Sequence, residues 1–75
     1  MKYEIRTAED FGAAIADRRN ELGKTQAELS KSAGISRDYL SKLESGRSSR
    51  VTEHVLRILR RMGATITVTF EDSDG

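Results

Sequence analysis

The chain of 75 residues contains no cysteine and no proline, and its only aromatic residues are two phenylalanines and two tyrosines. Without cysteine it forms no disulfides and offers no thiolate ligands to a metal. No apolar run approaches the roughly 20 residues of a membrane-spanning helix, and the first residues lack the pattern of a signal peptide. We therefore expect a single domain in the cytoplasm, away from membranes, whose small core favours oligomerisation.

The chain also lacks the side-chain combinations of an enzyme. His54 is the only histidine, and neither a cysteine nor a pair of carboxylates accompanies it at the spacing of a catalytic or metal-binding group. No glycine-rich phosphate loop of the right form is present. We therefore expect no catalytic activity, no cofactor and no metal site.

The charge of the chain is unevenly distributed. The formal net charge is only +1, but three carboxylates fall within residues 71–75, and without them the remaining charged residues leave 13 − 9 = +4. Basic residues recur in the middle of the chain, at Arg37, Lys42, Arg47 and Arg50. Because local charge governs attraction to phosphates, this region is the candidate contact with a nucleic acid.

Residues 25–46 read as two short helices joined by a tight turn. Thr25 and Glu28 have the spacing of a capping box, which predicts a helix that begins at Gln26. Gly34 stands where a left-handed residue would end that helix, and Ser36 is a good N-cap for a second one.

The two helices predicted here have distinct inner and outer faces. Leu29 and Ala33 are expected to be buried on the first helix, and Tyr39, Leu40 and Leu43 on the second. This leaves polar residues near the start of the second helix, namely Ser36, Arg37, Asp38, Ser41 and Lys42. A helix-turn-helix protein needs this arrangement, because its second helix enters the major groove and contacts base edges from its first turns.

Two further helices and a strand complete the expected fold. A first helix should begin at Thr7 and end at Leu22–Gly23, and a fourth should span about residues 52–62. The fourth helix carries more apolar residues than one stripe needs, so part of its surface is expected to face a second subunit. Residues 64–70 alternate apolar and threonine side chains, which predicts a strand. Its partner is either residues 2–6 of the same chain or the same strand of a twofold-related chain.

The segments TQAEL (25–29), AGIS (33–36) and LESG (43–46) resemble the phage-repressor (Xre-like) helix-turn-helix family, and the resemblance covers roughly residues 11–63. A single strand directly after the fourth helix, together with the opening phrase of residues 3–10, is similar to the HipB-type antitoxins within that family. That resemblance implies a homodimer that represses its own operon and binds a HipA-like kinase toxin. Only five residues follow the strand here, so a mechanism that needs a long tail does not transfer.

The resemblance also assigns roles to individual residues. It implies an ion pair between Arg19 and Glu44 that ties the first helix to the third, the alternative being that Arg19 is solvated. Base contacts are assigned to Ser36, Arg37, Asp38, Ser41 and Lys42. Three alternatives stay open: Lys42 takes a phosphate, Asp38 orients Arg37 and Lys42, and Ser41 is a solvated helix position. The residues themselves predict phosphate contacts at Thr25, Gln26, Arg47 and Arg50, from the start of one helix and from a basic loop. Capping alone would explain Thr25, and the loop of residues 47–50 could instead be simply solvated. Dimer contacts are expected at Val55, Leu59, Met62, Ile66, Val68 and Phe70.

The expected fold is therefore mainly α. An arm or short strand (residues 1–6) precedes a four-helix helix-turn-helix domain (7–63), a dimerisation strand paired across a homodimer (64–70) and an acidic tail (71–75). The expected function is a sequence-specific repressor that binds a pseudo-palindromic operator in double-stranded DNA and acts as the antitoxin of a kinase toxin. Two alternatives stay open: a protein-interaction module with secondary DNA binding, and an Xre-like regulator with no toxin partner.

Overall fold

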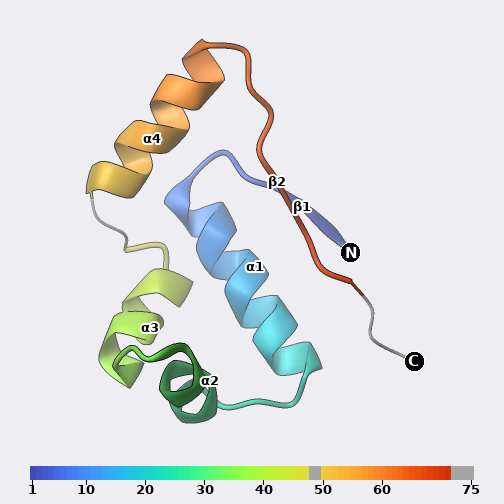
Figure 1. The fold of residues 1–75 in the computed structure, drawn as a ribbon, viewed down its shortest axis with the longest axis vertical. Helices are drawn as coiled ribbons and strands as arrows, with labels where there is room; N and C mark the ends of the chain where they lie inside the picture. The colour runs from blue at the N-terminus through green and yellow to red at the C-terminus, as the bar shows by residue number, and fades with distance from the viewer. Residues whose placement is uncertain (48–49, 72–75) are drawn as a thin grey trace.

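The structure is a computed structural model that describes residues 1–47 and 50–71. It contains four helices and two short strands in the described residues (Figure 1). In chain order these are β1 (Lys2–Glu4), α1 (Ala8–Glu21), α2 (Gln26–Ala33), α3 (Arg37–Glu44), α4 (Arg50–Arg61) and β2 (Thr67–Thr69). Two parts of the predicted organisation, the loop residues 48–49 and the tail residues 72–75, lie outside the described residues.

Side-chain caps fix the starts of the first three helices, and those at Thr25 and Ser36 are the predicted ones. The Thr7 hydroxyl accepts a hydrogen bond from the Asp10 backbone N–H, and the Asp10 carboxylate accepts one from the Thr7 N–H in return. Thr25 and Glu28 form the same reciprocal box at α2, and the Ser36 hydroxyl caps α3. Each cap satisfies N–H groups that the helix itself cannot pair.

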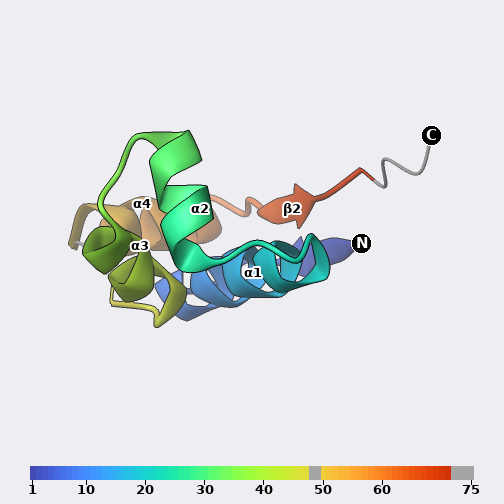
Figure 2. The same ribbon diagram turned by 90° about the horizontal axis from the view of Figure 1, so that it is seen from below.

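Helix α1 is the centre of the molecule. Figure 1 shows α3 along one side of α1 and the β1–β2 ribbon along the other, and Figure 2 shows α3 and α4 toward one end with β2 and the N-terminus toward the other. The helices α1 and α3 cross at Gly12, where an added Cβ would lie 2.5 Å from the Leu43 carbonyl oxygen. The buried apolar residues are Ile5, Ala8, Ala14, Leu40 and Leu56.

The terminal strand pairs within its own chain. β2 runs antiparallel to β1, with Tyr3 opposite Val68. The strand is shorter than the predicted residues 64–70, but its pairing continues through hydrogen bonds from the Ile5 N–H to the Ile66 carbonyl (2.8 Å) and from the Phe70 N–H to the Met1 carbonyl (3.0 Å). Of the two candidate partners of the terminal strand, the structure shows the one in the same chain, at residues 2–4. The expectation that this strand pairs across a homodimer is therefore wrong for this structure.

Three predictions about the helices are corrected by the structure. Ala33 was expected to be buried but is exposed. The inward-facing residues of α2 are Leu29 and the buried Ser30, whereas Ala33 is the last residue of the helix and is not covered. Tyr39 is 53% exposed, because Leu40 and Leu43 define the inward face of α3. Helix α4 begins at Arg50, two residues before the predicted start.

Candidate nucleic-acid interface

The first two turns of α3 present a polar surface. Arg37, Asp38, Ser41 and Lys42 are all exposed, whereas Leu40 on the opposite side is 3% exposed. At the start of the helix, the Ser36 hydroxyl oxygen accepts a hydrogen bond from the Tyr39 N–H at 3.0 Å. This cap occupies the oxygen as an acceptor and leaves the Ser36 O–H able to donate to an outside group.

Asp38 has a partner on the same helix. Its carboxylate lies 3.4 Å from the Lys42 ammonium, one helical turn away, and both side chains are exposed. Such a surface pair contributes little to stability, but it biases where the Lys42 ammonium lies. Arg37, in contrast, forms no ion pair with any residue that the structure describes.

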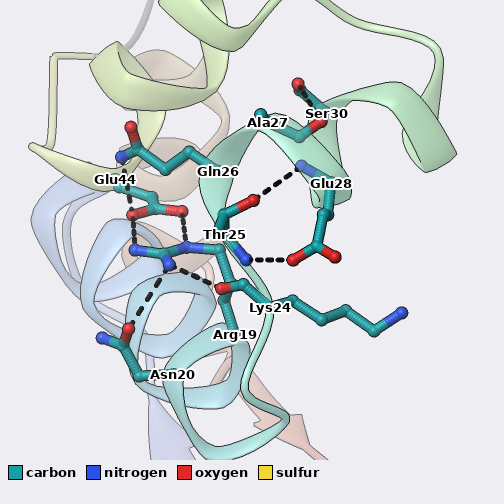
Figure 3. A network of polar contacts seen from close by, with 9 residues as sticks. All are labelled: Arg19, Asn20, Lys24, Thr25, Gln26, Ala27, Glu28, Ser30 and Glu44. Carbon is teal, nitrogen blue, oxygen red and sulfur yellow. Dashed lines mark hydrogen bonds and ion pairs between the residues drawn. The ribbon is translucent and has the colours of Figure 1, made fainter.

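A network around Glu44 joins α1, α2 and α3 (Figure 3). Arg19 Nε and Nη2 donate to the two Glu44 carboxylate oxygens at 2.8 and 3.0 Å, in the bidentate geometry that guanidinium groups favour. Arg19 also donates to the Lys24 carbonyl at 2.8 Å and thereby holds the link between α1 and α2. The two side chains are only 13% and 7% exposed, so the pair implied by the resemblance is a partly buried one.

The network shifts the acidity of its members. The hydrogen bonds from Arg19, supported by one from Gln26, hold the pKa of the Glu44 carboxyl below its ordinary value in spite of burial. The same contact raises the pKa of Arg19. Both groups are therefore charged at neutral pH, and α3 is held against α1 by a charged pair.

The phosphate contact predicted at Gln26 concerns backbone N–H groups, and the Gln26 side chain has a structural role besides. Its amide donates to a Glu44 carboxylate oxygen at 3.1 Å, so it is engaged inside the protein and braces α3. The backbone N–H groups of Gln26 and Ala27 have no acceptor among the described residues. They are therefore the groups at the start of α2 that could donate to a phosphate. The Thr25 hydroxyl oxygen accepts from the Glu28 N–H at 3.0 Å and serves the cap.

Arg47 and Arg50 lie on either side of the undescribed residues 48–49, and both are exposed. The Arg47 N–H donates to the Lys42 carbonyl at 2.9 Å, which places Arg47 directly behind the end of α3. Arg50 opens α4. Both arginines are thus close in the chain to the polar surface of α3.

Sequence reasoning missed Tyr39 as a surface residue. The signal was present, because Leu40, Leu43 and Glu44 share one face at i, i+3 and i+4, which leaves Tyr39 on the flank of α3. An exposed phenol beside Ser36 adds a hydrogen-bond donor to the polar surface.

The residues expected at a dimer contact fall into two groups. The side chains of Val55 and Met62 on α4 are 48% and 70% exposed. Val51 and Ile58 on the same helix are exposed as well. Leu59, Ile66, Val68 and Phe70 are half-buried in their own chain, and Phe70 packs edge-on against Tyr3 and under the Arg18 guanidinium. An apolar hollow of about 240 Å³ lies between the groups and is lined by Phe11, Val51, Thr52, Val55, Leu56, Leu59 and Ile66.

Residues 1–47 and 50–71 contain neither a candidate membrane span nor a candidate metal site. No helix there is long and apolar enough to cross a membrane. No group of three or more histidine or acidic side chains in these two ranges is placed to hold a metal ion.

Comparison with known proteins agrees with this architecture. A family model described as a helix-turn-helix domain matches residues 10–68. The ImmF control region 10 kDa protein of Bacillus phage phi105 is 45% identical over 48 residues, which are 64% of this chain and 53% of the phage protein, so the match spans about half of that relative.

A second relative matches along nearly its whole length. It is an uncharacterized HTH-type transcriptional regulator, y4mF, of Sinorhizobium fredii, which is 31% identical over 68 residues that cover 91% of this chain and 90% of the relative. No solved structure gives a significant match. From the family match and this relative, the chain belongs to the phage-repressor (Xre-like) helix-turn-helix family.

Proposed function

We propose that this protein is a sequence-specific DNA-binding transcriptional repressor whose α3 reads the major groove. The observation that carries the proposal is the two-sided construction of α3. Its inner side is fixed to α1 by the Arg19–Glu44 pair, and its first turns present exposed polar side chains. A groove reader needs both features, since base contacts require side chains held in a defined position.

Individual contacts follow from the chemistry of the exposed groups. Arg37 is assigned to a guanine, whose O6 and N7 match two guanidinium N–H donors. Ser36, Ser41 and Lys42 are assigned to neighbouring base edges, and Asp38 either accepts from a cytosine N4 or positions Lys42. Phosphates are assigned to Thr25, to the backbone N–H groups at Gln26, and to Arg47 and Arg50.

A homodimer would supply the second reading helix. The exposed apolar side chains of α4 and the hollow beside them give each chain an unfilled apolar surface, which a second copy of α4 would cover. Val55, Leu59 and Met62 are assigned to that contact together with Ile66, which lines the same hollow. Val68 and Phe70, on and directly after β2, do not line this hollow. Two α3 helices about 34 Å apart would then read a pseudo-palindrome.

The test is a DNA titration with the duplex upstream of this protein's own gene, at two salt concentrations and with competitor DNA. We expect tight binding that survives the competitor.

Arg37→Ala should lower affinity and relax the preference at one base pair, whereas Arg47→Ala should weaken binding to all duplexes and reduce the salt slope by about 1. Equal weakening of all sequences by Arg37→Ala would remove its assignment as a base reader.

A finer role, that of an antitoxin, is supported by a specific feature of the chain. The terminal strand after α4 and the opening phrase of residues 3–10 are both similar to HipB-type antitoxins. The pairing of that strand with β1 of its own chain departs from the pairing across a homodimer that the resemblance implies. The role predicts that a HipA-like kinase encoded next to this gene forms a stable complex with the protein and loses toxicity. If no such neighbour exists, or if purified neighbour and protein do not bind each other in calorimetry, a regulator without a toxin partner is the better description. A complex without operator binding would instead favour an interaction module.

A further inference from the structure

Helix α4 has the largest net positive charge of the helices and strands in the described residues. This helix contains four arginines and one glutamate, Glu53, and therefore carries 4 − 1 = +3. Since the whole chain carries +1, all other residues together carry 1 − 3 = −2. Because local charge governs attraction to anions, α4 is a candidate contact with an anionic partner in addition to the basic residues at and after α3.

Most of this charge lies in a single stripe. Arg50, His54, Arg57 and Arg61 follow one another at spacings of four, three and four residues, which places them on one face along the full length of α4. All four side chains are exposed, and none forms an ion pair with a residue in the described part of the chain. Elsewhere four cations do have carboxylate partners, namely Arg6, Arg18, Arg19 and Lys42.

The basic stripe is distinct from the surface assigned to the dimer. The exposed apolar side chains Val51, Val55, Ile58 and Met62 form a neighbouring strip with the same helical spacing. A second copy that covers the apolar strip leaves the basic stripe beside it open to solvent. The stripe is therefore a separate binding surface.

The far end of the stripe points away from the DNA-reading end of the molecule. In Figure 1, which has the 36 Å long axis vertical, α2 and α3 lie at the lower end and the C-terminal end of α4 lies at the upper end. Arg50 and Arg61 are eleven positions apart on the helix, which corresponds to about 17 Å along its axis. DNA held by α3 lies near Arg50, and Arg57 and Arg61 are carried away from it.

We propose that this stripe binds a row of carboxylates on an acidic helix of a protein partner. Arginine pairs with carboxylates through two parallel hydrogen bonds, and a helix with glutamates at i, i+4 and i+7 would match the spacing of the stripe. Complementary charge of this kind sets partner choice and speeds association. Arg50, at the near end of the stripe, is also assigned to a DNA phosphate, so the partner's helix is expected on the far part at Arg57 and Arg61. The protein would then hold its partner there while it is bound to the operator.

The test uses the whole ¹⁵N-labelled protein and a helical peptide that presents glutamates at i, i+4 and i+7. Amide shifts should centre on α4 around Arg57 and Arg61, and a peptide with glutamine in place of glutamate should cause none. The variant R57Q/R61Q should bind the glutamate peptide about tenfold more weakly. The control K2Q/K31Q removes the same charge from exposed positions elsewhere and should bind like the wild type.

Three outcomes would overturn the proposal. One is failure of the glutamate peptide to bind, or binding that shifts the α3 amides instead. Another is an equal loss of affinity in R57Q/R61Q and in the control, which would mean that net charge alone matters. The third is an unrelated DNA duplex that shifts the Arg57 and Arg61 amides as strongly as the peptide does, which would make the stripe a DNA surface. Operator affinity is measured on the same variants, and R57Q/R61Q should bind the operator as tightly as the wild type does. Failure of the acidic-helix proposal can thus be distinguished from failure of the repressor proposal.

Discussion

Among single residues, Glu44 couples the largest number of elements. Its carboxylate accepts from Arg19 on α1 and from Gln26 on α2 while it sits at the end of α3. Replacing it with glutamine leaves the Arg19 guanidinium partly buried without its counter-charge. We expect Glu44→Gln to lower the free energy of unfolding at pH 7 by about 2 to 3 kcal/mol.

The same carboxylate predicts a pH dependence. Because its pKa is lowered by folding, it contributes stability that is fully present above its unfolded pKa, near 4.3, and that is lost as pH falls through the lower folded pKa. Urea unfolding from pH 7 to pH 2.5 should therefore show the gap between wild type and Glu44→Gln closing below about pH 4.5. Asp10 and Glu28 also have lowered pKa values and titrate in both proteins. Parallel curves would mean that Glu44 contributes nothing to the acid sensitivity.

Asp38 allows a test of how α3 balances affinity against specificity. Its carboxylate pairs with Lys42 and, in the proposed complex, lies close to phosphates that repel it. We expect Asp38→Asn to bind all duplexes several-fold more tightly and to discriminate less between operator and competitor, because one repulsive charge is lost and Lys42 is released. Competition titrations would show this, and weaker binding to the operator alone would instead identify Asp38 as a base contact.

Within the elements, the starts of α1, α2 and α3 could be predicted from the sequence, whereas the start of α4 and the strand pairing could not. A cap is a local interaction, so Thr7, Thr25 and Ser36 signal their helices within four residues. The pairing of Tyr3 with Val68 joins the two ends of the chain, and alternation alone leaves its partner open. The exposed Tyr39 and buried Ser30 depend on how α2 and α3 meet, which periodicity in eight-residue helices does not fix.

The crossing of α1 and α3 depends on a glycine. An added Cβ at Gly12 would stand 2.5 Å from the Leu43 carbonyl oxygen and 2.6 Å from that of Glu44, both of them rigid backbone atoms. In an open helix, Gly→Ala stabilises by about 1 kcal/mol. Here we expect Gly12→Ala to destabilise by about 2 kcal/mol in urea unfolding and to weaken operator binding, because α3 must move away from α1.

The control for this substitution is Ala13→Gly at the exposed neighbouring position of α1. It reports the intrinsic helix preference without the crossing and should destabilise by no more than about 1 kcal/mol. If Gly12→Ala proved more stable than the wild type, the close approach of α1 to the end of α3 would not be a constraint on this fold.

At the scale of the whole molecule, α4 divides its surface among three roles. Leu56 faces the core of its own chain, Ile58 lies on the exposed apolar strip, and Arg57 belongs to the basic stripe. A helix with only its Leu56 side buried is weakly held by one chain. The sequence of α4 has more apolar residues than one buried stripe requires because a second, exposed apolar strip lies beside the Leu56 side. The proposed dimer depends on this second strip.

Ile58 separates dimer formation from folding. It is 56% exposed in the single chain, so Ile58→Glu removes little of the chain's own packing but places a charge in the proposed dimer contact, where burial without a partner is costly. We expect light scattering to show a dimer for the wild type and a monomer with unchanged helix content for Ile58→Glu. Ser32→Glu, an exposed change on α2, should stay dimeric. Because a monomer presents one α3, Ile58→Glu should bind a full operator about as weakly as the wild type binds a half-site. If the wild type were a monomer, or if Ile58→Glu still formed a dimer, the proposed dimer contact across α4 would be wrong.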